Sequence, residues 1–278
     1  MEELIRTPNF DGLPSLQDLI LKECPKLKEI HPSLENHTSL QYVSVWRCKK
    51  LRMFPTITHM KNLKDLSISF CPEILEFPKI HANMESLVEL TIEYTGIEVL
   101  PSSIGEHCTN LISLNLRRWT RIIEIPSSII ELSNLQELDL SLNDFSRLGF
   151  SLSQLTQLKV LNMSSCEKLL ELPEFPSSLT TLIADYCKSL TTFGDCHKNC
   201  RWLCDVSLKG GSIINDGDRL LESMLEACMA IENHYMFLRL KGIHQMAKGL
   251  TPQLVRGNRC TLQLPENWCN EFSGFLIN

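Results

Sequence analysis

Apolar residues recur along the first two thirds of the chain at a fixed spacing. In the segment that starts at Leu16, apolar residues stand 0, 3 and 5 places from the start, Cys24 stands 8 places from it, and most other places are polar. The same pattern begins again at Leu40, Leu63, Leu87, Leu111, Leu135, Leu158 and Leu179. The apolar–polar alternation predicts a short strand in each copy, because successive side chains of a strand point to opposite faces.

Successive copies begin 21 to 24 residues apart. This period and spacing are typical of a leucine-rich-repeat solenoid. One coil buries too little apolar surface to offset the entropy of ordering it, so neighbouring coils must stack. We therefore predict an α/β solenoid of about eight coils, a right-handed horseshoe with a parallel β-sheet on its concave side. The expected strands are residues 19–21, 43–45, 66–68, 90–92, 114–116, 138–140, 161–163 and 182–184.

The other side of each coil should be irregular or 3₁₀-helical, because proline follows the closing apolar residues of several coils and disfavours helix before it. These prolines are Pro55, Pro78, Pro101, Pro126 and Pro173. Five of the 12 cysteines fall at position 8 of a coil. Cysteines repeated at one core position indicate reduced, buried thiols in a cytosolic protein. The glycosylation sequons at Asn36 and Asn162 favour the alternative of a secreted ectodomain.

Charge and hydropathy exclude several classes of function. The net charge is −6, and the lysines and arginines are scattered, whereas a nucleic-acid interface is normally a basic stripe. The first residues contain no apolar run typical of a signal peptide, and no stretch of about 18 apolar residues occurs. We therefore expect a cytoplasmic or nucleocytoplasmic protein that binds neither nucleic acid nor membrane.

Motifs for catalysis are absent from the sequence. It contains no phosphate-binding loop, dinucleotide fingerprint, zinc-protease motif or nucleophile elbow. We expect no enzyme activity, no catalytic residues, no cofactor and no metal. One cluster, Cys196, His197, Cys200 and Cys204, has the residue types that zinc prefers. Its spacing of four favours a packed cap turn with the cysteines on one helix face, and zinc remains the alternative.

The repeat pattern is lost after residue 195 in this interpretation. Strand-like alternation returns at residues 237–240 and 260–264. We therefore divide the chain into a repeat domain, residues 1–195, and a cap with a small, incomplete β-rich module, residues 196–278. Trp268 and Phe275 are expected to anchor this module on the final coils.

Three segments resemble one protein family. They are residues 4–14 (LIRTPNFDGLP), residues 24–33 (CPKLKEIHPS) and residues 264–275 (LPENWCNEFSGF). The coil ending C-x-x-L-x-x-x-P, as in Cys48 to Pro55, is similar as well. The chain thereby resembles the repeat and post-repeat regions of plant TIR-type nucleotide-binding leucine-rich-repeat disease-resistance proteins, and the last segment resembles their jelly-roll-like domain.

The resemblance implies a recognition module of an intracellular immune receptor that senses a pathogen effector or a guarded host protein. In a full-length relative the repeats would also contact the nucleotide-binding domain. No segment resembles the family's NAD-cleaving TIR domain or its nucleotide switch, so the chain looks like a fragment that is inert in signalling. The alternatives are a scaffold or substrate-receptor subunit of the ubiquitin-ligase-adaptor type, or a truncated, non-signalling decoy.

The partner-binding surface should be the concave face of coils two to five. Positions 4, 6 and 7 of each coil are expected to face solvent there. Position 4 is small and polar, whereas aromatic residues and arginine, the types enriched at binding hot spots, gather near position 7. The candidate residues are Trp46, Arg47, Phe70, Tyr94, Arg118, Asn115 and Asp139. The alternative is a set of surface aromatics without a shared role.

Overall fold

The computed structural model describes residues 3–81, 83–119, 125–194, 196, 202–217, 219–220 and 223–224, together with the backbone of strands at 238–241, 253–255, 259–261 and 275–277. The chain forms two compact units, Met1–Asn143 and Asp144–Asn278. Each unit is described by itself.

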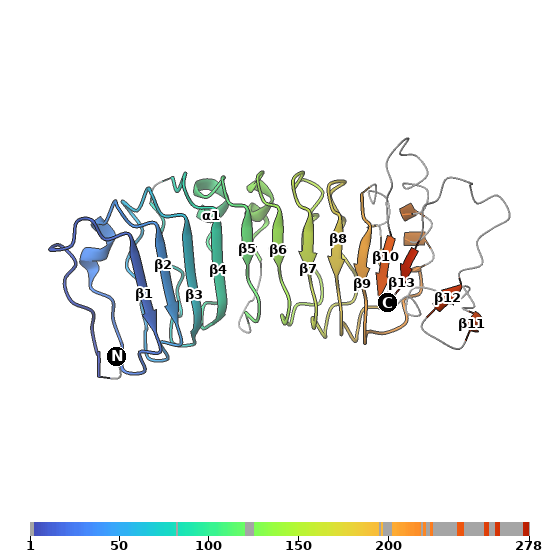
Figure 1. Cartoon of the computed structure of the whole chain (residues 1–278), viewed down its shortest axis with the longest axis horizontal. Coiled ribbons are helices and arrows are strands. Elements are labelled where there is room, and N and C mark those ends of the chain that lie inside the picture. The colour runs from blue at the N-terminus through green and yellow to red at the C-terminus, as the bar shows by residue number, and fades with distance from the viewer. Residues whose placement is uncertain are drawn as a thin grey trace. The chain divides into compact units, whose positions relative to one another are not determined.

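Six parallel strands line one side of the first unit (Figure 1). They are β1 (Asp18–Lys22), β2 (Tyr42–Trp46), β3 (Asp65–Cys71), β4 (Glu89–Thr95), β5 (Ser113–Asn115) and β6 (Glu137–Asp139). Equivalent residues of successive coils pair in register; Leu66, for example, pairs with Leu90, and Leu90 with Leu114. The predicted leucine-rich-repeat fold with a parallel sheet is confirmed.

The core of the first unit consists of the apolar positions that define the repeat. Leu40, Leu63 and Leu111 at position 0 are fully buried, as is Leu114 at position 3. Buried and outward residues alternate along β2 and β5. Because each coil supplies the same positions, the leucines stack into a continuous apolar column between the sheet and the opposite side.

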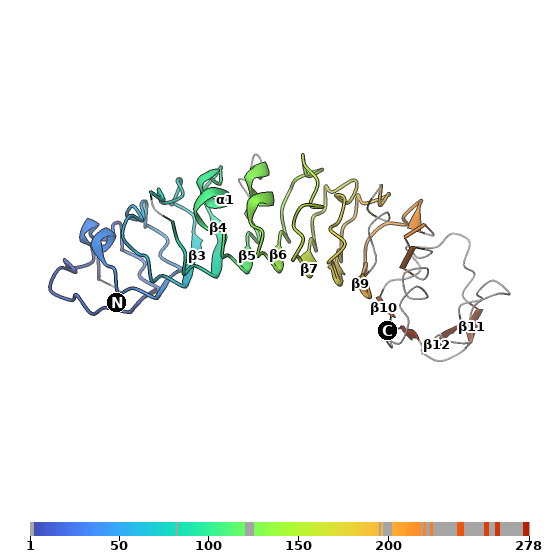
Figure 2. The same ribbon diagram turned by 90° about the horizontal axis from the view of Figure 1, so that it is seen from above.

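Short helical turns, not long helices, form the opposite side of the first unit (Figure 2). They are the 3₁₀ turns η1 (Pro32–Asn36) and η2 (Ser127–Glu131) and the five-residue helix α1 (Ser103–His107). Helix α1 packs very closely on η2, since a Cβ atom on Gly105 would clash with the carbonyl oxygen of Ser128. The prediction of an irregular or 3₁₀ side is confirmed, with α1 as a single short helix.

The cysteines at position 8 are buried free thiols, as predicted. Cys24, Cys48 and Cys71 are fully buried, and Cys48 Sγ donates to the carbonyl oxygen of Leu21 at 3.5 Å in the preceding coil. In the second unit, Cys187 Sγ donates to the carbonyl oxygen of Met163 at 3.1 Å, and burial raises the pKa of this thiol to about 11. Cys187 therefore stays protonated near neutral pH and serves as a small apolar residue with one weak donor.

The second unit continues the repeat in parallel strands. They are β7 (Val160–Asn162), β8 (Thr181–Ile183), β9 (Asp205–Ser207), β10 (Leu238–Lys241) and β13 (Phe275–Ile277), while β11 (Gln253–Val255) pairs antiparallel with β12 (Arg259–Thr261). The first two match the predicted strands within one residue.

A ninth coil follows the point where the sequence pattern was expected to end. Strand β9 pairs in parallel with β8, and Leu203, Val206 and Leu208 at positions 0, 3 and 5 are buried. Gly210 at position 7 has a φ of +64°, the left-handed conformation that the other coils also adopt there. The repeat pattern therefore continues beyond residue 195. The division into domains 1–195 and 196–278 stays a prediction.

The expected β-rich module lies largely outside the described residues. Trp268 is not described, and of Phe275 only the backbone in β13 is. Within the described residues, no helix has the length and apolar character needed to cross a membrane.

Candidate protein-binding surface

The turn at the end of each strand holds one residue in the left-handed conformation. This residue is always position 7 of its coil: Glu23, Arg47, Phe70, Tyr94, Arg118, Leu142, Ser165 and Tyr186 have φ between +49° and +60°. A left-handed residue with a Cβ costs roughly 1–2 kcal/mol. A hydrogen bond to the next coil opposes this cost: the N–H of Arg47 donates to the carbonyl oxygen of Ser69 at 3.0 Å.

The left-handed turn decides which side chains reach the surface. In coil three, Ser69 at position 6 is buried, whereas Phe70 at position 7 is half-buried and turned outward. The expectation that position 6 faces solvent is therefore wrong for Ser69. The positive φ of Phe70 interrupts the alternation of inward and outward side chains along the strand. In this coil the side chain at position 7, and not the one at position 6, therefore points outward.

Five of the predicted residues form one continuous row on the strand side of the first unit. The ring centroids of Trp46 and Phe70 lie 6.3 Å apart with an edge-on geometry, and those of Phe70 and Tyr94 lie 5.6 Å apart. The guanidinium of Arg47 lies 4.2 Å from the centroid of Trp46, and that of Arg118 lies 4.6 Å from the centroid of Tyr94. Residues about 24 positions apart thus touch through ring–ring and cation–π contacts.

Lys22 is a sixth member of this row that the sequence interpretation missed. Its Nζ lies 5.0 Å from the centroid of the Trp46 ring. Lys22 stands at position 6 of coil one, the position that Trp46 has in coil two, so the repeat register contained the signal. We define the cation–aromatic row as Lys22, Trp46, Arg47, Phe70, Tyr94 and Arg118.

The row carries a local positive charge on an acidic protein. Positions 6 and 7 of the first five coils hold four cations and two carboxylates. Arg47 pairs with Glu23 at 3.3 Å, and Arg117 lies 3.9 Å from Glu93. These pairs are half exposed, and pairs of this kind contribute about 1 kcal/mol at most to stability.

Asn115 and Asp139 do not join the row. They lie at position 4, and each closes the turn at the end of its strand: Asn115 Oδ1 accepts the N–H of Arg117 at 3.0 Å, and Asp139 Oδ1 accepts the N–H of Ser141 at 2.8 Å. Side-chain oxygens that bond the backbone two residues ahead are a common turn device. A structural role is therefore visible for both residues, and their part in binding stays a prediction.

Carboxylates line the opposite ends of the same strands. This acidic row, at position 2, consists of Asp18, Asp65, Glu89 and Glu137. Asp65 and Glu89 are paired in register on β3 and β4. Partial burial, with a smaller effect from the charge of Glu89, raises the pKa of Asp65 to about 6. The strand face of the first unit thus carries negative charge at one end of its strands and positive charge with aromatic rings at the other.

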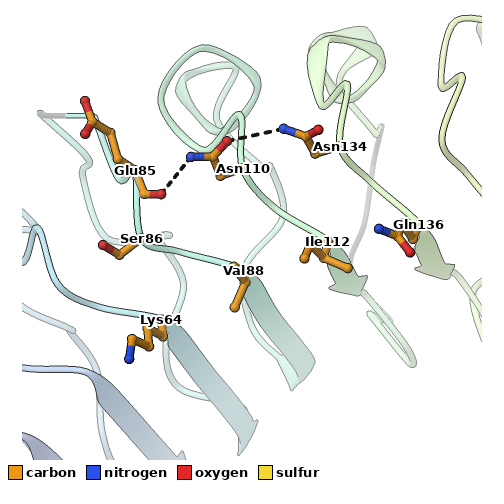
Figure 3. A pocket seen from close by; sticks show the side chains of 8 residues that line it. All are labelled: Lys64, Glu85, Ser86, Val88, Asn110, Ile112, Asn134 and Gln136. Atoms are coloured by element: carbon orange, nitrogen blue, oxygen red, sulfur yellow. Dashed lines mark hydrogen bonds between the residues drawn. The ribbon is translucent and has the colours of Figure 1, made fainter.

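A shallow hollow of about 470 Å³ lies where β3 to β6 begin, at the same end as the acidic row (Figure 3). Its lining includes the exposed Ile112 and two asparagines that bond along the solenoid. Asn110 Nδ2 donates to the carbonyl oxygen of Glu85 at 2.8 Å, and Asn134 Nδ2 donates to Asn110 Oδ1 at 3.2 Å. The lining holds no cysteine, histidine or aspartate, and its amides are engaged in holding adjacent coils together.

The cysteine–histidine cluster is only partly described. Cys196 is fully buried, and Cys204 lies just before β9, where its N–H donates to the carbonyl oxygen of Thr180 at 3.0 Å. This places Cys204 in the ninth coil and not on a helix face. His197 and Cys200 lie outside the described residues, among which no group of three metal-binding side chains occurs.

The repeats are similar in sequence to those of plant disease-resistance proteins. The chain is 31% identical to the TMV resistance protein N of Nicotiana glutinosa over 140 residues, which is 50% of this chain and 12% of that protein. It is 33% identical to the disease resistance protein RML1A of Arabidopsis thaliana over 187 residues, 66% of this chain and 18% of that protein. For the disease resistance protein RPS6 of Arabidopsis thaliana the identity is 29%, over 64% of this chain and 16% of that protein.

The chain therefore spans less than a fifth of the length of these curated relatives. They are TIR-type nucleotide-binding leucine-rich-repeat disease-resistance proteins, so the predicted resemblance is confirmed. No model of a known protein family matches the chain. Among solved structures, the leucine-rich-repeat domain of the type III effector XopL is similar, with a TM-score of 0.53 and 23% identity over 88% of this chain and 71% of that one. That likeness concerns the fold.

Proposed function

We propose that this chain, similar in its repeats to plant disease-resistance proteins, is the recognition module of an intracellular immune receptor and binds a protein ligand through the strand face of its first unit. The ligand is a pathogen effector or a host protein that such effectors modify. The cytoplasm, where both kinds of ligand act, is the proposed location.

The cation–aromatic row is the observation that carries this proposal. Trp46, Phe70 and Tyr94 are half-buried rings in mutual contact, so they present apolar area with little side-chain freedom left to lose on binding. Tryptophan, tyrosine and arginine dominate the binding energy at protein interfaces, and they do so as clusters. A surface that only needed to be soluble would favour lysine and glutamate at these positions.

The buried core and the row are also separate in the sequence. The side chains at positions 0, 3, 5 and 8 form the core of the coil, whereas the side chains of the row come from positions 6 and 7, so the row can vary with little change to the core. The lining of the shallow hollow at the other end of the strands has no arrangement of nucleophile and base. Binding, and not chemistry on a substrate, is the function that this geometry supports.

The proposal is tested by comparing ligand capture by three forms of the chain. The wild type, the double variant Trp46→Ala/Tyr94→Ala and the control Met53→Ala/Val99→Ala are used to isolate proteins from infected and healthy leaf extracts. Met53 and Val99 are exposed apolar residues outside the row and the strands. A ligand retained by the wild type and the control but lost from the row variant is then purified and titrated.

Truncation of one hot-spot residue typically costs 2 kcal/mol or more, which corresponds to a Kd about 30-fold weaker. We expect at least this loss for the row variant, with the circular dichroism spectrum and Tm of all three forms alike. A purified ligand that binds the row variant and the wild type equally well would refute the use of this surface.

A further inference from the structure

We propose that the cation–aromatic row binds an extended acidic segment of its protein partner, with two carboxylates held by Lys22 and Arg118 at its two ends. This inference rests on the proposed function, because it assigns a ligand chemistry to the same surface.

The two ends of the row are its unneutralised cations. Arg47 inside the row pairs with Glu23, and the adjacent Arg117 lies near Glu93. Lys22 and Arg118 are exposed and form no ion pair within the described part of the chain, where each contacts one aromatic ring. An arginine whose guanidinium lies over a ring still has N–H groups that can bind a carboxylate. Both ends therefore offer a charge without an ion-pair partner among the described residues.

The floor between these two cations is apolar and already ordered. Trp46, Phe70 and Tyr94 contact each other edge-on or tilted, so each ring is held by its neighbour. The rings present partly exposed surface to apolar side chains of a ligand. Because the rings touch, a flat base has no room to stack between neighbouring rings, which disfavours single-stranded nucleic acid at this row.

Repeat geometry fixes the distance between the two charges. Lys22 and Arg118 lie at the ends of β1 and β5, four parallel-strand steps apart. With neighbouring strands about 4.8 Å apart, the separation is about 19 Å. An extended peptide rises roughly 3.3 Å per residue, so its acidic residues should be about six positions apart. The ligand is thus a segment that crosses the strand ends, acidic at both ends and apolar between them.

Charge elsewhere on the strand face determines where this segment lies. The acidic row Asp18, Asp65, Glu89 and Glu137 repels it from the beginning of the strands. The protein carries a net charge of −6, so the cation–aromatic row is a local exception to its overall charge. An acidic ligand is therefore directed to this row by both attraction and repulsion.

The test uses fluorescein-labelled peptides with the complete chain. The probe, Asp-Ser-Leu-Ser-Leu-Ser-Asp with blocked ends, places its carboxylates six positions apart and on the same face of the extended peptide as its leucines. Two controls have lysine in place of both aspartates, or the same composition with the aspartates adjacent. Binding is followed by fluorescence anisotropy, up to about 2 mM protein or unlabelled competitor. We expect the spaced acidic peptide to bind at least about 3-fold more tightly than either control.

Lys22→Gln and Arg118→Gln should each weaken binding of this peptide about 3-fold, as expected for one exposed ion pair. Lys61→Gln removes an exposed charge outside the row and should leave binding unchanged. Equal binding of the lysine peptide or of the adjacent-aspartate peptide overturns the proposal. So does an acidic preference that survives in both row variants, an absence of saturable binding, or stronger binding of octathymidylate. These results test only the acidic-segment proposal. The Trp46→Ala/Tyr94→Ala experiment tests separately whether this surface binds the protein ligand.

Discussion

Asn143 accepts the backbone N–H of Trp119 at 2.8 Å, one coil away, through its side-chain Oδ1. The Nδ2 of the same side chain donates to the carbonyl oxygens of Leu116 and Leu140 at 2.9 and 2.8 Å. Asn143 is fully buried, and so is Trp119. Asparagine thus joins two coils at position 8, where five other coils have cysteine.

Replacing Asn143 with alanine should destabilise the protein by about 3 kcal/mol, because three buried backbone groups lose their partners at once. Urea unfolding followed by circular dichroism measures the difference. Asn134→Ala is the matched control: Asn134 bonds Thr109 and Asn110 but is exposed, so its loss should cost about 0.5 kcal/mol. Equal effects of the two substitutions would show that Asn143 has no special role.

Thr95 occupies position 8 in coil four and is buried, yet its Oγ1 lacks a hydrogen-bond partner within the described residues. Thr95→Val removes this hydroxyl at nearly constant shape and should stabilise the protein by about 1 kcal/mol. Thr7→Val supplies the contrast, since Thr7 Oγ1 accepts the N–H of His31 at 2.8 Å. That change should be destabilising by about 1 kcal/mol. Thermal unfolding of both variants measures these changes in stability. Destabilisation by Thr95→Val would contradict the finding that the Thr95 hydroxyl is buried without a hydrogen-bond partner among the described residues.

Asp65 predicts a specific pH dependence of stability. Its pKa of about 6 exceeds the usual value of 3.8, so the folded state holds this proton more tightly than the unfolded chain. The carboxyl group therefore becomes destabilising as the pH rises from about 4 through 6. Asp65→Asn should stabilise the protein by about 1 kcal/mol at pH 7, a figure reduced for solvent screening, and have little effect at pH 4.

Denaturant unfolding of wild type and variant at the two pH values measures this difference. Asp18→Asn serves as the control, because Asp18 holds the same position but is paired in register with Tyr42, not with a carboxylate. It should show a smaller change between the two pH values. The same stabilisation by Asp65→Asn at pH 4 and pH 7 would exclude the proposed electrostatic cause.

At a left-handed turn position, glycine should be a more stabilising replacement than alanine, which is the reverse of the usual order. Ser165 has a φ of +58°, and its N–H donates to the carbonyl oxygen of Asp185. Ser165→Gly and Ser165→Ala both remove the hydroxyl, but only glycine adopts this φ without steric cost. The glycine variant should be the more stable of the two by about 1 kcal/mol, as measured by differential scanning calorimetry. At Ser113, in the extended strand β5, alanine should instead be the more stable replacement.

The strands could be predicted from the sequence because each depends on a local pattern. Leu66, Leu90 and Leu114 are buried wherever the coils stack, so spacing alone predicts both the strands and their register. The ninth coil was missed for a physical reason. Its position 8 is Gly211, so the coil lacks the side chain that occupies this position in the other coils, although Leu203 follows Leu179 by a normal step of 24 residues.

The candidate site could be predicted only as a set of residue types. The sequence brought Trp46, Phe70 and Tyr94 to one face, but their contacts depend on a left-handed turn that simple alternation does not contain. Asn115 and Asp139 were chosen as outward polar residues, and their hydrogen bonds to the turn were not visible in the spacing. The repeat register was sufficient to predict Lys22 as part of the row, but Lys22 lies in coil one, whereas the predicted surface comprises coils two to five.

The in-register pairing of equivalent residues has a consequence for how such a gene changes. A duplication or deletion of one whole repeat, about 24 codons, leaves every core position paired with its equivalent position and every left-handed turn in place. If one repeat between Lys22 and Arg118 were duplicated or deleted, the distance between these two residues would change by one strand spacing, about 4.8 Å, without disturbing the core. Unequal crossing-over would therefore change the distance between anchoring charges in fixed steps, each step corresponding to a ligand longer or shorter by one to two residues.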